Sequence, residues 1–161
     1  MSNFPQPIRK QRKGNFPYKF KITEAYSYKD TGWKLTSKFE SDWLSISEMG
    51  EVIVNPAVKS YAWDGCTPKM SILNLFTLGV PDGHVDFRTM KEYTYDASLV
   101  HDALYQYLDS VPVPKAEIDK LFLKMLGDFK LRWPYYLAVK YFGGRGIVQK
   151  GVTQVNFSRT S

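Results

Sequence analysis

The first third of the chain alternates apolar and polar residues with a period of two, as half-exposed strands do. Residues 18–22 place lysines between apolar residues, and residues 33–39, 43–46 and 52–54 also read as strands. Residues 47–51 contain a glycine and predict a hairpin turn between the last two strands. Residues 56–95 contain six prolines and glycines, so we expect an irregular segment there.

The second half changes to the spacing of amphipathic helices. We expect one helix from Asp96, as its N-cap, to about residue 108 and a second from Pro114 to about residue 128. Pro134 opens a third helix, which Gly143 ends together with the glycine that follows it. The predicted class is therefore α+β, with an N-terminal antiparallel β-sheet followed by a helical hairpin and a third helix.

The length and composition fit one domain with extensions at both ends. The chain has 161 residues, of which 43% are hydrophobic, which is enough to close one core. We expect an extended basic arm at 1–17, a single α+β domain at 18–146, and a C-terminal tail at 147–161 that can add one strand. One cysteine allows no internal disulfide, and the longest apolar stretch, 72–80, is too short to span a bilayer, so we expect a soluble protein without a membrane span.

The net charge of +6 equals the charge of the N-terminal end. Residues 1–21 hold six Lys and Arg and no acid, and the remainder holds equal numbers of acids and bases. Nucleic acid is therefore not expected as the main partner, because a dedicated binder shows a basic face on the fold itself. Arg9, Lys10, Arg12 and Lys13 are instead candidates for docking the arm on a protein partner.

The candidate chemistry lies in the predicted helical hairpin. A connection of about five residues makes the two helices antiparallel neighbours. His101 and Asp119 lie at similar distances from that connection, so their side chains can meet across the hairpin. A carboxylate on one imidazole nitrogen raises the basicity of the other, which suits activation of water. Tyr105 lies four residues after His101, on the same face, and can also bond Asp119. These three residues are the candidate catalytic set.

Asp102 is rotated by about 100° from its histidine neighbour, so it is expected to point elsewhere, where it could ligate a hard cation. The segment from Asp64 and Gly65 to residue 68 is the best candidate to complete such a metal site, because glycine permits close approach of the backbone. Cys66 is a weaker candidate nucleophile, since no histidine is near it in sequence. His84 and Asp86 could join a metal site in a phosphohydrolase variant of this hypothesis.

Each of these features also has a purely structural interpretation. Acids are favoured in the first turn of a helix, where Asp119 lies, and a tyrosine at position 105 can belong to the core. The 64–68 segment can be a simple turn. A network of His101, Tyr105 and Asp119 can also serve only to hold the hairpin together. The sequence leaves both interpretations open.

Several segments in a fixed order resemble the domain of unknown function 1353 family. These are Asp64–Pro68, Val100–Tyr105, Ile118–Phe122 with Met125, and then Tyr136, Ala138, Val139, Phe142 and Gly143. The resemblance covers residues 50–145. It implies an origin in bacteriophages or prophages, with no established activity, and hence a location in the host cytoplasm during infection and then in the phage particle.

A second, local resemblance concerns the pattern His101-Asp102-x-x-Tyr105 with Asp119 on the next helix. It is similar to secreted and viral-capsid phospholipase A2. The similarity implies that His101 is the base, that Asp102 binds calcium, and that Asp119 and Tyr105 orient the histidine. Calcium is the candidate cofactor on this reading.

Two functions follow from these patterns. The first is a virion-associated structural or assembly component, in the tail, neck or capsid, that binds other phage structural proteins through the basic arm; it requires fewer assumptions. The alternative is a metal-assisted hydrolase, in which His101 activates water. The two roles are compatible in one protein.

Overall fold

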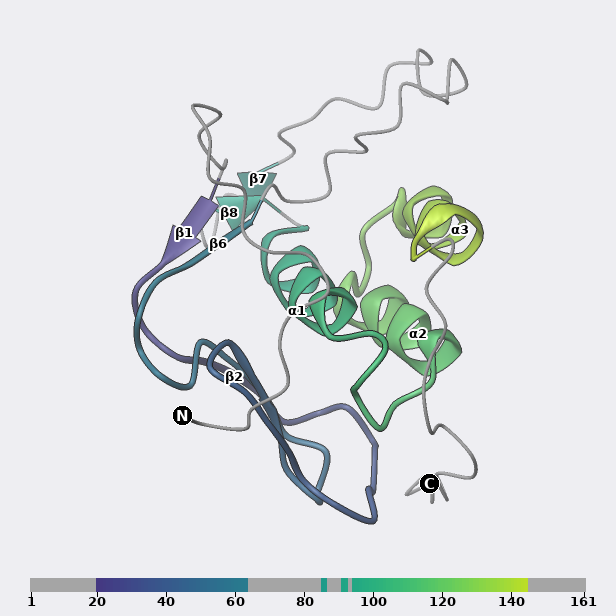
Figure 1. The fold of residues 1–161 in the computed structure, drawn as a ribbon. Coiled ribbons are helices and arrows are strands. Elements are labelled where there is room, and N and C mark those ends of the chain that lie inside the picture. The colour runs from purple at the N-terminus through teal and green to yellow at the C-terminus, as the bar shows by residue number, and fades with distance from the viewer. Residues whose placement is uncertain (1–19, 64–84, 87–90, 93, 145–161) are drawn as a thin grey trace.

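The computed structural model describes residues 20–63, 85–86, 91–92 and 94–144. In these residues the β-strands come first along the chain and three helices follow, which confirms the α+β class (Figure 1). The predicted arm at 1–17 and the tail at 147–161 lie outside the described residues.

The described strands are short and pair antiparallel. One four-stranded sheet has the order β2-β5-β4-β3, and two further pairs are β1-β6 and β7-β8. The bounds are β1 (Phe20–Ile22), β2 (Tyr26–Tyr28), β3 (Phe39–Glu40), β4 (Leu44–Ile46), β5 (Val52–Val54), β6 (Tyr61–Trp63), β7 (Val85–Asp86) and β8 (Lys91–Glu92).

The β4-β5 hairpin forms where the alternation predicts it. The first and last residues of both strands are fully buried, and the middle residue of each is only half-buried. The turn closes through a hydrogen bond from Ser47 N to Glu51 O at 2.9 Å and another from Gly50 N to Ser47 O at 2.9 Å. Gly50 adopts a φ of 82°, a conformation that side chains disfavour.

Two expectations about the strands are wrong. Residues 33–38 form no strand, although Trp33 and Leu35 are buried. Their backbone makes isolated hydrogen bonds, from Trp33 N to the Thr31 hydroxyl and from Leu35 N to Glu48 O, and no strand among the described residues pairs with them. Residues 56–95 are not wholly irregular, since β6, β7 and β8 lie there; β6 alternates buried Tyr61 and Trp63 around a half-buried alanine.

The helices are α1 (Tyr95–Gln106), α2 (Lys115–Met125) and α3 (Arg132–Phe142). Asp96 was expected as the N-cap of the first helix, but it lies in the first turn of α1 and Thr94 is the N-cap. Pro114 was expected in the first turn of the second helix, but it is the N-cap of α2. The connection over residues 107–114 is longer than expected. Gly143 follows the last residue of α3, as predicted. Among the described residues, no helix combines the length and apolar character that crossing a membrane requires.

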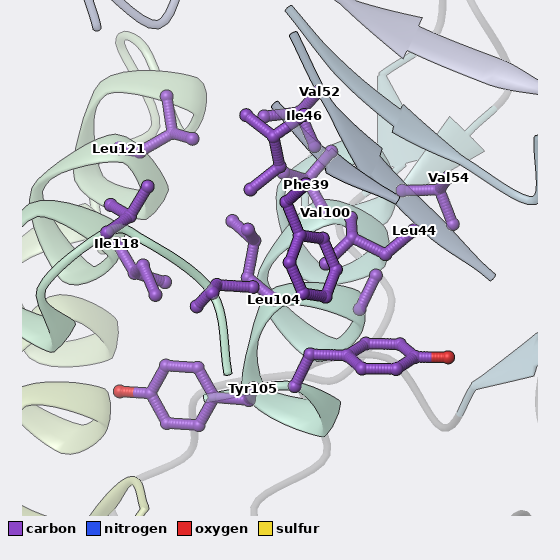
Figure 2. Packing of buried hydrophobic residues seen from close by; sticks show 14 of the residues in the cluster. Phe39, Leu44, Ile46, Val52, Val54, Val100, Leu104, Tyr105, Ile118 and Leu121 are labelled. Atoms are coloured by element: carbon purple, nitrogen blue, oxygen red, sulfur yellow. The ribbon is translucent and has the colours of Figure 1, made fainter. Parts of the chain in front are cut away.

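The main core lies between the four-stranded sheet and α1. Figure 2 shows Leu44, Ile46, Val52 and Val54 from the strands facing Val100 and Leu104 of α1, with α2 packed on the other side of α1. A smaller cluster joins α1, α2 and α3 through Ala97, Phe122 and Leu126, against which Tyr135 and Val139 of α3 pack. Helix α1 therefore contacts the sheet with one face and the other helices with another, and the candidate residues lie on this second side.

Substitution of Gly32 and of Gly50 tests the close packing at the β4-β5 turn. Both glycines adopt a positive φ, but only Gly50 lies close to other atoms. A Cβ at Gly50 would collide with the carbonyl oxygen of Trp33 and the Thr31 hydroxyl, whereas a Cβ at Gly32, at φ 72°, would meet nothing within 4 Å. We expect Gly32→Ala to cost about 1 kcal/mol of unfolding free energy and Gly50→Ala about 3 kcal/mol, measured by urea denaturation. Equal losses would contradict the packing of Trp33 under this turn.

Candidate active site

Helices α1 and α2 bring the predicted catalytic residues together. His101 and Tyr105 are one turn apart on α1, and both contact residues of α2. Figure 2 shows the hydroxyl of Tyr105 pointing away from the strands. Asp119 lies on α2, one turn after Lys115. The contact between His101 and Asp119 that helix periodicity predicts is present in the structure.

Asp119 is the centre of this group, and both of its carboxylate oxygens have partners. Its side chain is 2% exposed. Oδ1 accepts a hydrogen bond from the Tyr105 hydroxyl at 2.5 Å and lies 3.5 Å from Nε2 of His101. Oδ2 accepts a hydrogen bond from Nζ of Lys115 at 2.7 Å. A carboxylate this deeply buried stays charged because cationic and hydroxyl donors surround it.

The imidazole of His101 packs against two aromatic rings. Its centroid is 4.0 Å from that of Tyr105 and 4.8 Å from that of Phe122, and its side chain is 8% exposed. Nε2 is buried without a hydrogen-bond partner, so its contact with Asp119 at 3.5 Å is electrostatic. The distance between Nε2 and Oδ1 would have to shorten slightly for a hydrogen bond to form. The rings fix the plane of the imidazole and leave its two nitrogens to face the two carboxylates.

Asp102 lies on the outer side of the imidazole. Its side chain is 37% exposed, and its Oδ1 is 3.9 Å from Nδ1 of His101. The expectation that it points elsewhere is therefore wrong, because the ends of the two side chains come close to each other although their Cβ directions differ. The inner nitrogen thus faces a buried carboxylate and the outer nitrogen faces a half-exposed one.

The two carboxylates control the charge of the imidazole. Burial alone would lower the pKa of His101, but the carboxylates of Asp102 and Asp119 outweigh it and raise that pKa above the ordinary 6.5. Burial opposes the charge of Asp119 as well, but His101, Lys115 and Tyr105 outweigh it and hold the pKa of Asp119 below 3.8. Burial, together with the hydrogen bond to Asp119, raises the pKa of Tyr105, so its hydroxyl remains a donor.

These shifts have opposite consequences for stability. The raised pKa of His101 means that its stabilising contribution is complete below pH 6.5 and is lost as the pH rises through the folded-state pKa. The lowered pKa of Asp119 means that its contribution is present above pH 3.8 and is lost as the pH falls through the folded-state pKa.

Lys115 connects the group to α3 and was not among the predicted residues. Its ammonium donates hydrogen bonds to the carbonyl oxygens of Val139, at 3.2 Å, and Lys140, at 2.9 Å. These carbonyls belong to the last turn of α3, where a cation is favourable. The i,i+4 spacing from Lys115 to Asp119 was the available sequence signal. The contact with α3 had no local signal, because it depends on how the helices pack.

Most of the other predicted site residues lie outside the described part of the chain. Asp64, Gly65, Cys66, the 64–68 segment and the partner-binding residues Arg9, Lys10, Arg12 and Lys13 lie outside the described residues, as does His84. Asp86 is the last residue of β7, before the first residue of α1 at Tyr95. Within the described ranges, no group of three or more His, Cys, Asp or Glu side chains is arranged to hold a metal ion.

Comparisons with known proteins add no family assignment. No protein family model, no curated protein and no solved structure matches the chain. The resemblance to the domain of unknown function 1353 family therefore stays a prediction.

Removing the charge of Asp119 tests the network directly. Asp119→Asn keeps the shape of the side chain but leaves Lys115 and His101 without their anionic partner. We expect a loss of about 3 kcal/mol of unfolding free energy, measured by urea denaturation near neutral pH. The control is Asp42→Asn, which removes an exposed ion pair with Lys59 and is expected to cost less than about 1 kcal/mol. Equal costs for the two variants would contradict a buried, charged Asp119.

Proposed function

We propose that the chain is a hydrolase in which His101 activates water for attack on an acyl ester. One observation carries the proposal: Nε2 of His101 lies 3.5 Å from a buried carboxylate of Asp119 that Tyr105 and Lys115 hold in place. A general base needs its inner nitrogen paired with a fixed anion and its outer nitrogen near solvent. The half-exposed Asp102 beside Nδ1 marks that outer side.

The reaction assigns a distinct task to each residue. Nδ1 of neutral His101 takes a proton from water as the water oxygen forms a bond to the acyl carbon. Asp119 stabilises the imidazolium that results, and remains ionised because its pKa is lowered. The bond from the acyl carbon to the alcohol oxygen then breaks, and the imidazolium returns the proton to that oxygen. The products are a carboxylic acid and an alcohol, and His101 is again neutral.

Calcium is a candidate cofactor by resemblance only. Asp102 supplies one half-exposed carboxylate, whereas calcium takes six to eight oxygen ligands. The residues expected to complete the site, Asp64 and Gly65, lie outside the described residues. The described residues alone do not make a calcium site, so no step of the reaction is assigned to the ion.

The role in a phage particle is a second and compatible proposal. It rests on the resemblance to a phage family and on the basic arm of residues 1–17, which contains no acid. Such an arm fits an extension that docks on another structural protein of the particle. The contacts among His101, Tyr105 and Asp119 support the hydrolase proposal and do not test this one.

The test is hydrolysis of a soluble, monomeric acyl ester by the full chain across a pH series. Removal of the base in His101→Gln is expected to lower kcat/KM by about 10²–10⁴-fold. In the wild type kcat/KM should rise with pH through a midpoint above 6.5, because the flanking carboxylates raise the pKa of His101 and only its neutral form accepts a proton.

Two further variants separate catalysis from folding. Asp119→Asn should move the midpoint of the pH profile downwards, whereas Asp42→Asn should leave both the rate and the profile unchanged. Circular dichroism verifies that each variant is folded at the assay temperature. Absence of turnover in the wild type, or full activity in a folded His101→Gln, would refute the hydrolase proposal.

A further inference from the structure

Helix α3 presents a row of large apolar side chains to solvent. Trp133, Leu137 and Tyr141 are spaced by four residues and are 54%, 44% and 59% exposed. The opposite side of the helix carries Tyr135 and Val139, which pack on the smaller core cluster. We call the three exposed residues the outer stripe. Single exposed apolar residues are ordinary, but three on one helical face indicate a contact surface.

Helix α3 is peripheral among the described elements. The helix lies at the edge of the described part of the molecule, next to α2 and away from the four-stranded sheet (Figure 1). Lys140 flanks the stripe, and its ammonium lies 5.4 Å from the ring centroid of Tyr141. Its side chain therefore places a positive charge at the border of the apolar row.

The sequence of α3 and of the described residues next to it carries only positive charge. Residues 129–144 contain three bases, Lys130, Arg132 and Lys140, and no acid; the sequence of residues 129–161 as a whole contains six Lys and Arg and no acid. Residues 22–128 hold all 16 acids of the chain and ten bases. Residues 22–161 are therefore neutral only in total: residues 22–128 are acidic, and residues 129–161 are basic.

We propose that α3 docks on the surface of an anionic lipid bilayer through the outer stripe and its flanking bases. Indole and phenol rings favour the headgroup level of a bilayer, where one edge is apolar and the other is hydrated. Lys and Arg beside them are attracted to anionic headgroups. A helix with Trp, Leu and Tyr on one face and bases at its borders lies in the plane of the interface.

Other occupants fit the outer stripe less well. A stable protein interface takes about 20–30 residues from each side, far more than three side chains on one short helix. A second copy would bring basic residues against basic residues. A nucleic acid would meet the bases and the rings but would give the aliphatic Leu137 no favourable surroundings.

The docking helix is linked to the candidate centre. Lys115 bonds both Asp119 and the last carbonyls of α3, so the docking helix is anchored directly to the helix that carries Asp119. The role of docking in presenting lipid esters rests on the proposed function. The binding itself does not, and the two claims can therefore fail separately.

The experiment is sedimentation of the full chain with phosphatidylcholine vesicles that contain or lack phosphatidylglycerol. We expect binding to the anionic vesicles that weakens as salt is added. The triple variant Trp133→Ser, Leu137→Ser, Tyr141→Ser should bind at least ~10-fold more weakly. Met49→Ser, at a residue that is 73% exposed in the β4-β5 turn, is the matched control and should bind as the wild type does.

Charge reversal provides a second pair of variants. Lys140→Glu should weaken binding to anionic vesicles by about tenfold, whereas reversal of the exposed Lys34, which lies far from α3 in sequence, should have a much smaller effect. The proposal is overturned if the wild type binds neither vesicle or if the triple variant binds as tightly as the wild type. It is also overturned if the stripe residues instead support a concentration-dependent dimer, or if the chain binds an oligonucleotide but no vesicle.

A parallel assay keeps this inference distinct from the hydrolase proposal. The triple variant should retain the wild-type rate on the soluble ester, because its substituted residues lie outside the catalytic group. Vesicle binding without ester turnover would leave the docking surface standing and refute the enzyme. Turnover of the soluble ester without vesicle binding would support the hydrolase and refute the docking surface.

Discussion

A buried carboxylate determines how the three helices fit together. Asp119 lies in the interface of α1 and α2 with 2% of its side chain exposed, where an unpaired charge would be prohibitively unfavourable. Its charge is balanced by a hydrogen bond from Tyr105 of α1, by a hydrogen bond from Lys115 of its own helix, and by the electrostatic contact with His101 of α1. Because Lys115 also binds the last carbonyls of α3, one anion fixes the mutual positions of all three helices.

The same constraint determines the surroundings of the His101 imidazole. Two aromatic rings hold the plane of His101, and two carboxylates face its two nitrogens. The inner carboxylate is rigid and buried, while the outer one is half-exposed. A histidine that served only to fill the core would not need an anion at each nitrogen, and burial without them would favour its neutral form. The arrangement fits a base whose charged state is stabilised in advance of the reaction.

The limits of prediction follow from which contacts are local in sequence. The β4-β5 hairpin could be predicted because alternation and Gly50 are local features, and so could the His101–Asp119 contact, which follows from helix periodicity and a short connection. Residues 33–38 were predicted as a strand and are not, because a strand also needs a partner in register, which their own pattern does not reveal. The hydrogen bonds from Lys115 to α3 could not be predicted from the sequence either, because they too depend on how distant elements pack. Asp102 was misplaced because the rotation between neighbouring residues fixes their Cβ directions but not where the ends of their side chains lie.

Asp119 holds His101 in a readily charged state, and an NMR titration of the His101 ring in the folded chain tests this interaction. We expect a pKa above 6.5 for His101 in the wild type and a lower value in Asp119→Asn. A pKa at or below 6.5 in the wild type that does not change on removal of the Asp119 charge would contradict it.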